Sequence, residues 1–111
     1  MSTAEVQAAK TIYWHRDLPP LDAELIGEHT LEADSKRISS ALAHRDQLWA
    51  ECYRDLMTQA TRRLEQEIAR LGGHGAHVLA ESVDVRHDDA HGEAWLHGRF
   101  NYVLYRRSVF A

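Results

Sequence analysis

The sequence contains few of the residues that define several classes of protein. Its 111 residues include a single cysteine, Cys52, so no internal disulfide can form and a disulfide-stapled secreted scaffold is excluded. The 17 acidic residues outnumber the 13 basic ones, and the net charge is −4 at pH 7. Basic pairs occur at Arg62-Arg63 and Arg106-Arg107, but neither continues into a basic stripe. This charge distribution argues against a nucleic-acid-binding protein.

Long apolar runs are also missing. The first residues, MSTAEVQAAKTIYW, lack the apolar stretch of a secretory signal peptide. No later segment approaches the about 20 apolar residues that span a bilayer. We therefore expect a cytoplasmic protein that makes no membrane contact. The use of 11 arginines against two lysines is typical of a bacterial genome rich in GC.

The length and composition are those of one globular domain. Apolar residues make up 44% of the chain and charged residues 27%, both ordinary values for a folded protein. Residues 1–10 are small and polar and show no hydrophobic period. We therefore expect a flexible N-terminus followed by a single domain over 11–111.

The clearest element is a long amphipathic helix over residues 44–71. Its apolar residues recur at steps of three and four, which places them on one broad stripe. These residues are Trp49, Cys52, Tyr53, Leu56, Ala60, Leu64, Ile68 and Leu71. The glycine pair Gly72-Gly73 supplies the left-handed residue that commonly ends a helix.

Four segments show the pattern of β-strands. Residues 11–16 are β-branched and aromatic, and residues 23–33 alternate in polarity around a glycine that suggests a bulge. Residues 76–86 and 93–107 also alternate and flank the polar run 87–92, so they should form an antiparallel hairpin. The order β-β-α-β-β predicts an α+β fold, with one long amphipathic helix packed on one face of a four-stranded antiparallel-type sheet.

The alternation also assigns side chains to the two faces of this sheet. Within 76–86 it places Leu79, Val83 and Val85 on one face. A single helix covers one face only, yet the last strand alternates large apolar residues onto the other: Trp95, Val103 and Tyr105. Uncovered apolar surface of this kind usually marks an interface, so we expect a homo-oligomer.

These elements carry a resemblance to a known family. The matching features are Gly27-Glu28 in the second strand, the helix positions Tyr53, Ala60, Leu64 and Ala69, the junction RLGGHGAHVLAESVDV, and Gly98 in the last strand. Over residues 24–107 the chain resembles the small bacterial YbjQ-like proteins, described as heavy-metal-binding domains. The resemblance implies a protomer that assembles into a ring, often a pentamer, and binds metal. It assigns no ligand set to particular residues.

The histidine-rich run RHDDAHGEAWLHGRF is the candidate metal site. Histidine is a common ligand of divalent transition metals, and the chain has eight histidines. The candidate ligands are His87, Asp89, His91 and His97. Their spacing matches no zinc signature, and the alternative is a solvated hairpin turn in which aspartates cap backbone N–H groups. We expect an exposed turn over 87–92, with a positive φ at Gly92 and weak metal binding at most.

A second candidate site involves histidines on the first two strands. If these strands pair, His15 and His29 would be neighbours, with Glu28 or Glu32 nearby, and a histidine–carboxylate pair can act as a general base. The alternative is that these are polar positions on the wet face of the sheet. Such residues are most often polar positions of this kind, so we favour the alternative.

The interface itself is a further candidate site. Trp14, Trp95, His97 and Tyr105 are the residues that could line pockets at subunit boundaries. The sequence therefore leaves two functions open. One is an oligomeric metal-binding domain, and the other is an oligomer with ligand-binding or catalytic pockets at its interfaces.

Overall fold

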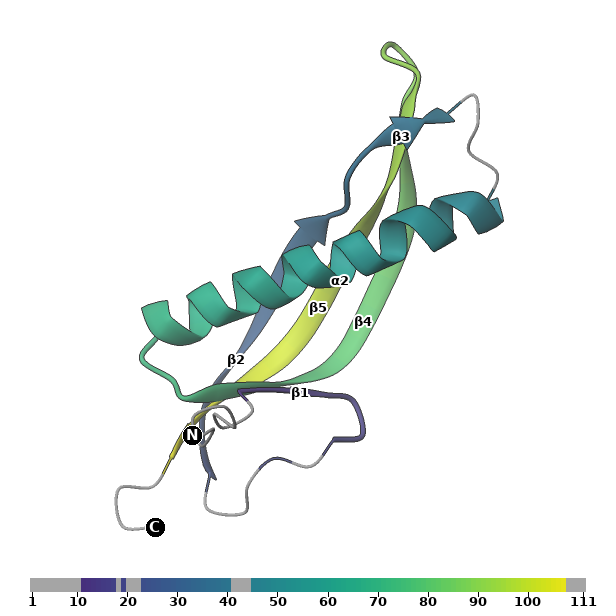
Figure 1. Ribbon diagram of the computed structural model, residues 1–111. Coiled ribbons are helices and arrows are strands. Elements are labelled where there is room, and N and C mark those ends of the chain that lie inside the picture. Colours follow the sequence, from purple (N-terminus) through teal and green to yellow (C-terminus); the bar gives the residue numbers. More distant parts are fainter. Residues whose placement is uncertain (1–10, 18, 20–22, 41–44, 108–111) are drawn as a thin grey trace, which may run out of the picture.

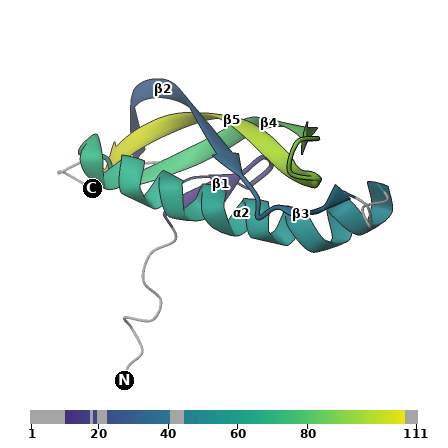
Figure 2. The ribbon, with the colours of Figure 1, turned by 90° about the horizontal axis from the view of Figure 1, so that it is seen from above.

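A computed structural model describes residues 11–17, 19, 23–40 and 45–107 of the chain. The elements in chain order are β1 (Ile12–Trp14), β2 (Ala23–Asp34), β3 (Ile38–Ser39), α2 (Arg45–Arg70), β4 (Gly75–Asp88) and β5 (Glu93–Arg107). The long helix crosses one face of a twisted sheet, which gives two layers (Figure 1, Figure 2). The α+β class is therefore confirmed. The N-terminus predicted to be flexible, residues 1–10, lies outside the described residues.

The sheet is open, and β5 lies inside it. Its strand order is β1-β4-β5-β2, and β3 also pairs with β5. Two features differ from the predicted four-stranded antiparallel sheet. Residues Ile38–Ser39, predicted as part of a polar connection, form a fifth short strand. β1 pairs with β4 in parallel, so the sheet is mixed. Two paired residues are too few to produce a hydrophobic period, which is why the sequence did not show β3.

The core forms where the apolar stripe of α2 meets the sheet. Cys52, Leu56, Ala60 and Leu64 on the helix have no exposed surface. They face the even-numbered side chains of β5, which are buried as a group: Ala94, Leu96, Phe100, Tyr102 and Leu104. The predicted helix and its stripe are confirmed. Its predicted end is confirmed too, because Gly72 has a φ of 75°.

Two β-bulges decide which side chains face the helix. One lies between Leu25 and Gly27 in β2, as the glycine there suggested. The other lies between Val78 and Ala80 in β4, where no glycine or other residue indicates a bulge. The assignment of Leu79 to the same face as Val83 is therefore wrong. The bulge turns Leu79 outward, 52% exposed, and brings the fully buried Val78 onto the helix side.

The helix covers the sheet unevenly. It contacts β5 and β2 much more than β4 and β1. Along the less covered side, several apolar residues are only partly buried against the edge of the core: Trp14, Trp49, Tyr53, Met57, Val83 and Val85. We call these six residues the open apolar strip. It runs between α2 and β4 and leaves one side of the core incompletely shielded from water.

Truncation of a side chain in the helix stripe should destabilise the protein. Leu64→Ala removes a fully buried side chain and should lower the free energy of unfolding by about 2–5 kcal/mol. Urea unfolding measures this change. Glu65→Ala, at the exposed neighbouring position, is the matched control and should change stability by less than about 0.5 kcal/mol. An equally small effect of Leu64→Ala would contradict the packing described here.

Candidate functional site

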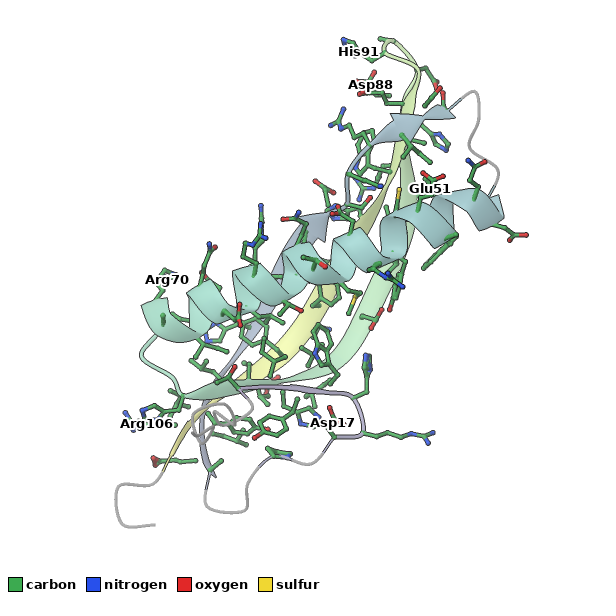
Figure 3. All side chains as sticks on the ribbon, viewed as in Figure 1. Asp17, Glu51, Arg70, Asp88, His91 and Arg106 are labelled. Carbon is green, nitrogen blue, oxygen red and sulfur yellow. The ribbon has the colours of Figure 1, made fainter. Side chains whose placement is uncertain are left out.

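The predicted metal ligands do not converge. His91 lies at the tip of the β4–β5 hairpin, where its Nδ1 is 2.8 Å from Oδ2 of Asp88 (Figure 3). His87 pairs with Ala94 on the helix-facing side of the hairpin, whereas His97 points from the opposite face. Asp89 is exposed in the turn. Gly92 has the predicted positive φ, 61°. The described residues contain no group of three or more histidine, cysteine or acidic side chains placed to hold a metal ion.

His97 is instead held between two carboxylates of the neighbouring strand. Its Nδ1 lies 2.6 Å from Oδ1 of Asp34, and its Nε2 lies 2.7 Å from Oε1 of Glu32. The hydrogen bond to Asp34 raises the pKa of His97 most, with Glu32 adding to the increase and burial opposing it. Ionised carboxylates only accept hydrogen bonds, so both ring nitrogens are donors in this arrangement. His97 therefore links β5 to β2 and offers no lone pair to a metal.

The His97 link makes stability depend on pH. A histidine whose pKa is raised on folding contributes its full stabilisation below its unfolded pKa, about 6.5. This contribution is lost as the pH rises through the raised pKa of folded His97. His97→Gln should therefore destabilise the protein more at pH 6 than at pH 8.5, as measured by urea unfolding. The exposed His87→Gln is the control, and an equal loss at both pH values would contradict the role of the charge.

The predicted interface residues lie on different faces of the chain. On the open face of the sheet, Arg37 stacks over the ring of Trp95 with its guanidinium carbon 3.8 Å from the ring centroid. Tyr105 is only 6% exposed, so part of the apolar surface expected to need a partner is already covered within the chain. Trp14 lies on the helix side, edge-on to Phe100. Within one chain Trp14 therefore cannot share a pocket with Trp95.

The two strand histidines are not neighbours. β1 pairs with β4, whereas β2 pairs with β5, so His15 and His29 lie on separate parts of the sheet. His29 packs against the ring of Tyr102, with the two ring centroids 5.6 Å apart. The histidine–carboxylate pair expected for His15 does exist, but its carboxylate belongs to Glu81 rather than to Glu28 or Glu32.

Glu81 is the centre of a cluster that joins three elements. Its Oε1 lies 2.8 Å from Nε2 of His15, in the turn after β1, and its Oε2 accepts a hydrogen bond of 2.9 Å from the Tyr53 hydroxyl on α2. We call His15, Tyr53 and Glu81 the Glu81 cluster. The bulge in β4 sets the position of Glu81, because beyond it the strand places Glu81 opposite the buried Phe100.

The backbone at His15 is unusual and firmly held. His15 has a φ of 52°, a left-handed conformation uncommon for residues other than glycine. Its N–H donates to the carbonyl of Val78 at 2.8 Å, and its own carbonyl accepts from Nε2 of His77 at 2.7 Å. Backbone outliers that the surroundings enforce are concentrated at functional sites. In this conformation the His15 ring lies against the Glu81 carboxylate.

The Glu81 cluster combines one carboxylate with several aromatic rings. Burial raises the pKa of Tyr53, and the Glu81 carboxylate raises it further, so the phenol remains a hydrogen-bond donor. Trp14 stacks on His15, and Trp49 packs on Tyr53 with a centroid separation of 5.4 Å. The His15 side chain is 42% exposed and that of Glu81 19% exposed, so solvent reaches the cluster.

Sequence reasoning named Trp14 and His15 but missed Tyr53 and Glu81. The helix periodicity places Tyr53 in the apolar stripe, and Glu81 is one of several polar residues in an alternating strand. The only available signal was the short run TIYWHR, where aromatic residues precede a histidine. The partner of that histidine depends on which strand β1 joins, and on a bulge that leaves no mark in the sequence.

Comparison with known proteins finds no relative of this chain. The chain matches no protein-family model, no curated protein and no solved structure. The YbjQ-like resemblance therefore stays a prediction that depends on the sequence motifs alone. No helix in the described part of the chain is long and apolar enough to cross a membrane.

Proposed function

We propose that this protein is a small-ligand-binding domain that takes a small organic amine or ammonium compound at the Glu81 cluster. The observation that carries the proposal is the partly exposed Glu81 carboxylate, fixed between His15 and Tyr53, whose rings pack in turn against the indole rings of Trp14 and Trp49. A carboxylate with aromatic faces beside it is the combination that recognises a cation attached to an apolar body.

The two parts of such a ligand would meet different residues. The positive nitrogen would lie against Glu81, whose orientation is fixed in advance by the two hydrogen bonds it accepts. The apolar body would lie along the open apolar strip, where Trp49 and Met57 are only partly buried. A carboxylate that is already oriented loses little conformational entropy on binding. The net charge of −4 also favours the approach of cations over anions.

The amine proposal favours one of the two functions left open by the sequence. It keeps the small-ligand-binding function and places the site beside α2, away from Trp95. Two observations favour it over metal binding: His97 has both ring nitrogens engaged by carboxylates, and His87 and His97 lie on opposite faces of the hairpin.

A titration of tryptophan fluorescence tests this proposal. Benzylamine, which is positively charged at pH 7, should quench or shift the emission saturably, and the uncharged benzyl alcohol should bind at least about tenfold more weakly. Glu81→Gln keeps the size of the side chain and one acceptor oxygen, but it removes the charge and replaces the second acceptor with an NH2 donor. It should reduce the affinity for benzylamine to that for the alcohol.

Glu65→Gln is the matched control, because it removes an equal charge at an exposed position of α2 outside the cluster. It should leave the titration unchanged. Equal binding of the amine and the alcohol, or equal affinity of the wild type and Glu81→Gln, would contradict the proposal. Circular dichroism of both variants confirms that the fold is intact.

A further inference from the structure

One edge of β4 is open along most of its length. β1 pairs with β4 only from Ala76 to Val78, and the last hydrogen bond there is donated by His15 to the Val78 carbonyl. Beyond this point, over residues 82–88, no other described strand pairs with that edge (Figure 1). The opposite edge of the same segment is fully paired with β5. An open edge presents unpaired backbone N–H and C=O groups to another strand.

The side chains along this edge complement themselves. Antiparallel pairing of two identical strands about Val85 places Asp84 of one copy opposite Arg86 of the other, twice by symmetry. Val85 then lies opposite itself on the helix-facing side. Like charges do not face each other directly at Asp84 or Arg86 in this register. Opposite charges in directly opposed positions stabilise a strand pair.

The same charges are weakly engaged within one chain. Arg86 Nη2 and Asp84 Oδ2 are 3.9 Å apart, and their side chains are 52% and 60% exposed. Residues two apart on a strand share a face without being directly opposed, so this internal pair holds them loosely. Both side chains are therefore available to a facing strand at little energetic cost.

The apolar residues next to this edge are also incompletely buried within one chain. Val83 and Val85 face the helix layer but are only partly buried, because α2 lies mainly over β5 and β2. A second copy placed edge to edge would bring its own Val83 and Val85 beside them. The open apolar strips of two copies would then adjoin across the symmetry axis.

From these observations we propose that two copies of this chain form a twofold dimer by antiparallel pairing of their β4 strands over residues 82–88, centred on Val85. The dimer joins two sheets into one continuous sheet with the helices on the same face. It is a different interface from the Trp95 face predicted from the sequence. It also goes beyond the amine-binding proposal and does not depend on it, because the Glu81 cluster lies outside the paired segment.

Charge reversal at the two complementary positions tests the dimer, with mass measured by sedimentation equilibrium. The wild type should be dimeric at about 100 µM, a concentration at which even a weak specific pairing is populated. Asp84→Arg and Arg86→Asp should each weaken dimerisation at least about tenfold, because each places like charges opposite each other twice. The double variant Asp84→Arg/Arg86→Asp restores opposite charges and should restore the dimer.

The Glu24–Arg106 pair supplies the matched control. It is an exposed pair at 3.5 Å at the far end of the β2–β5 ladder, with side chains 60% and 51% exposed. Glu24→Arg should leave the mass unchanged. The double variant also controls for misfolding. It carries both substitutions, so if it associates like the wild type, misfolding does not explain the loss of the dimer in the single variants.

A cysteine substitution on the symmetry axis gives an independent measurement. Directly opposed residues of an antiparallel pair have Cα atoms about 4.5–5.5 Å apart, within the range that a disulfide spans. Val85→Cys should therefore form a covalent dimer on mild oxidation. Ser82→Cys on the same strand should not, because it lies opposite Asp88 of the other copy. The native Cys52 has no exposed surface and does not interfere.

Three results would overturn the dimer proposal. One is a wild-type protein that stays monomeric at about 100 µM, a concentration sufficient for specific pairing. The second is a dimer that both single charge reversals leave intact while Trp95→Glu dissociates it, which would place the interface on the other face of the sheet. The third is equal cross-linking of Val85→Cys and Ser82→Cys. None of these results bears on benzylamine binding, so the two proposals fail separately.

Discussion

The structure depends on one geometric constraint, which is that a single helix must cover a sheet wider than itself. An α-helix with its side chains is about 10–12 Å across, and neighbouring strands are about 4.8 Å apart, so one helix shields about two strands. Here α2 lies over β5 and β2. Leu56 and Leu64 of α2 and Phe100 of β5 are fully buried where the helix meets the sheet. β4 is left with a half-shielded face, and the open apolar strip follows directly from this mismatch.

The Glu81 cluster lies on the boundary that this mismatch creates. Under the helix a carboxylate would lose too much hydration, and on the opposite face of the sheet it would lie away from Tyr53 and Trp14. At the boundary Glu81 stays partly hydrated while α2 supplies Tyr53 and the turn after β1 supplies His15. His97 shows the contrasting case on the other face. Its hydrogen bonds to Asp34 and Glu32 are complete, so it stabilises strand pairing and has no capacity left for a ligand.

Structural features that depend on residues close together in the sequence were predictable. The helix stripe around Leu56 and Leu64, its glycine end and the β4–β5 hairpin follow from periodicity and turn chemistry. The pairing of β1 with β4 and the bulge after Val78 depend on long-range packing, so the site was not predictable beyond His15 and Trp14. Gly98, one of the positions behind the family resemblance, is explained by packing alone. A side chain there would come within 2.8 Å of the Phe100 ring and 3.1 Å of Leu56.

The position of β5 between β2 and β4 has a consequence for how the chain folds. β4 and β5 form a hairpin of neighbouring residues, which can assemble within microseconds. β2 must instead find β5 across a long separation, as the hydrogen bond between Thr30 and Asn101, 71 positions apart, illustrates. Contacts this distant in sequence slow folding, because the entropy of loop closure is lost before the contacts form. Until β2 docks, the β5 edge of the hairpin is open in addition to the β4 edge, and the chain is then at its most prone to aggregation.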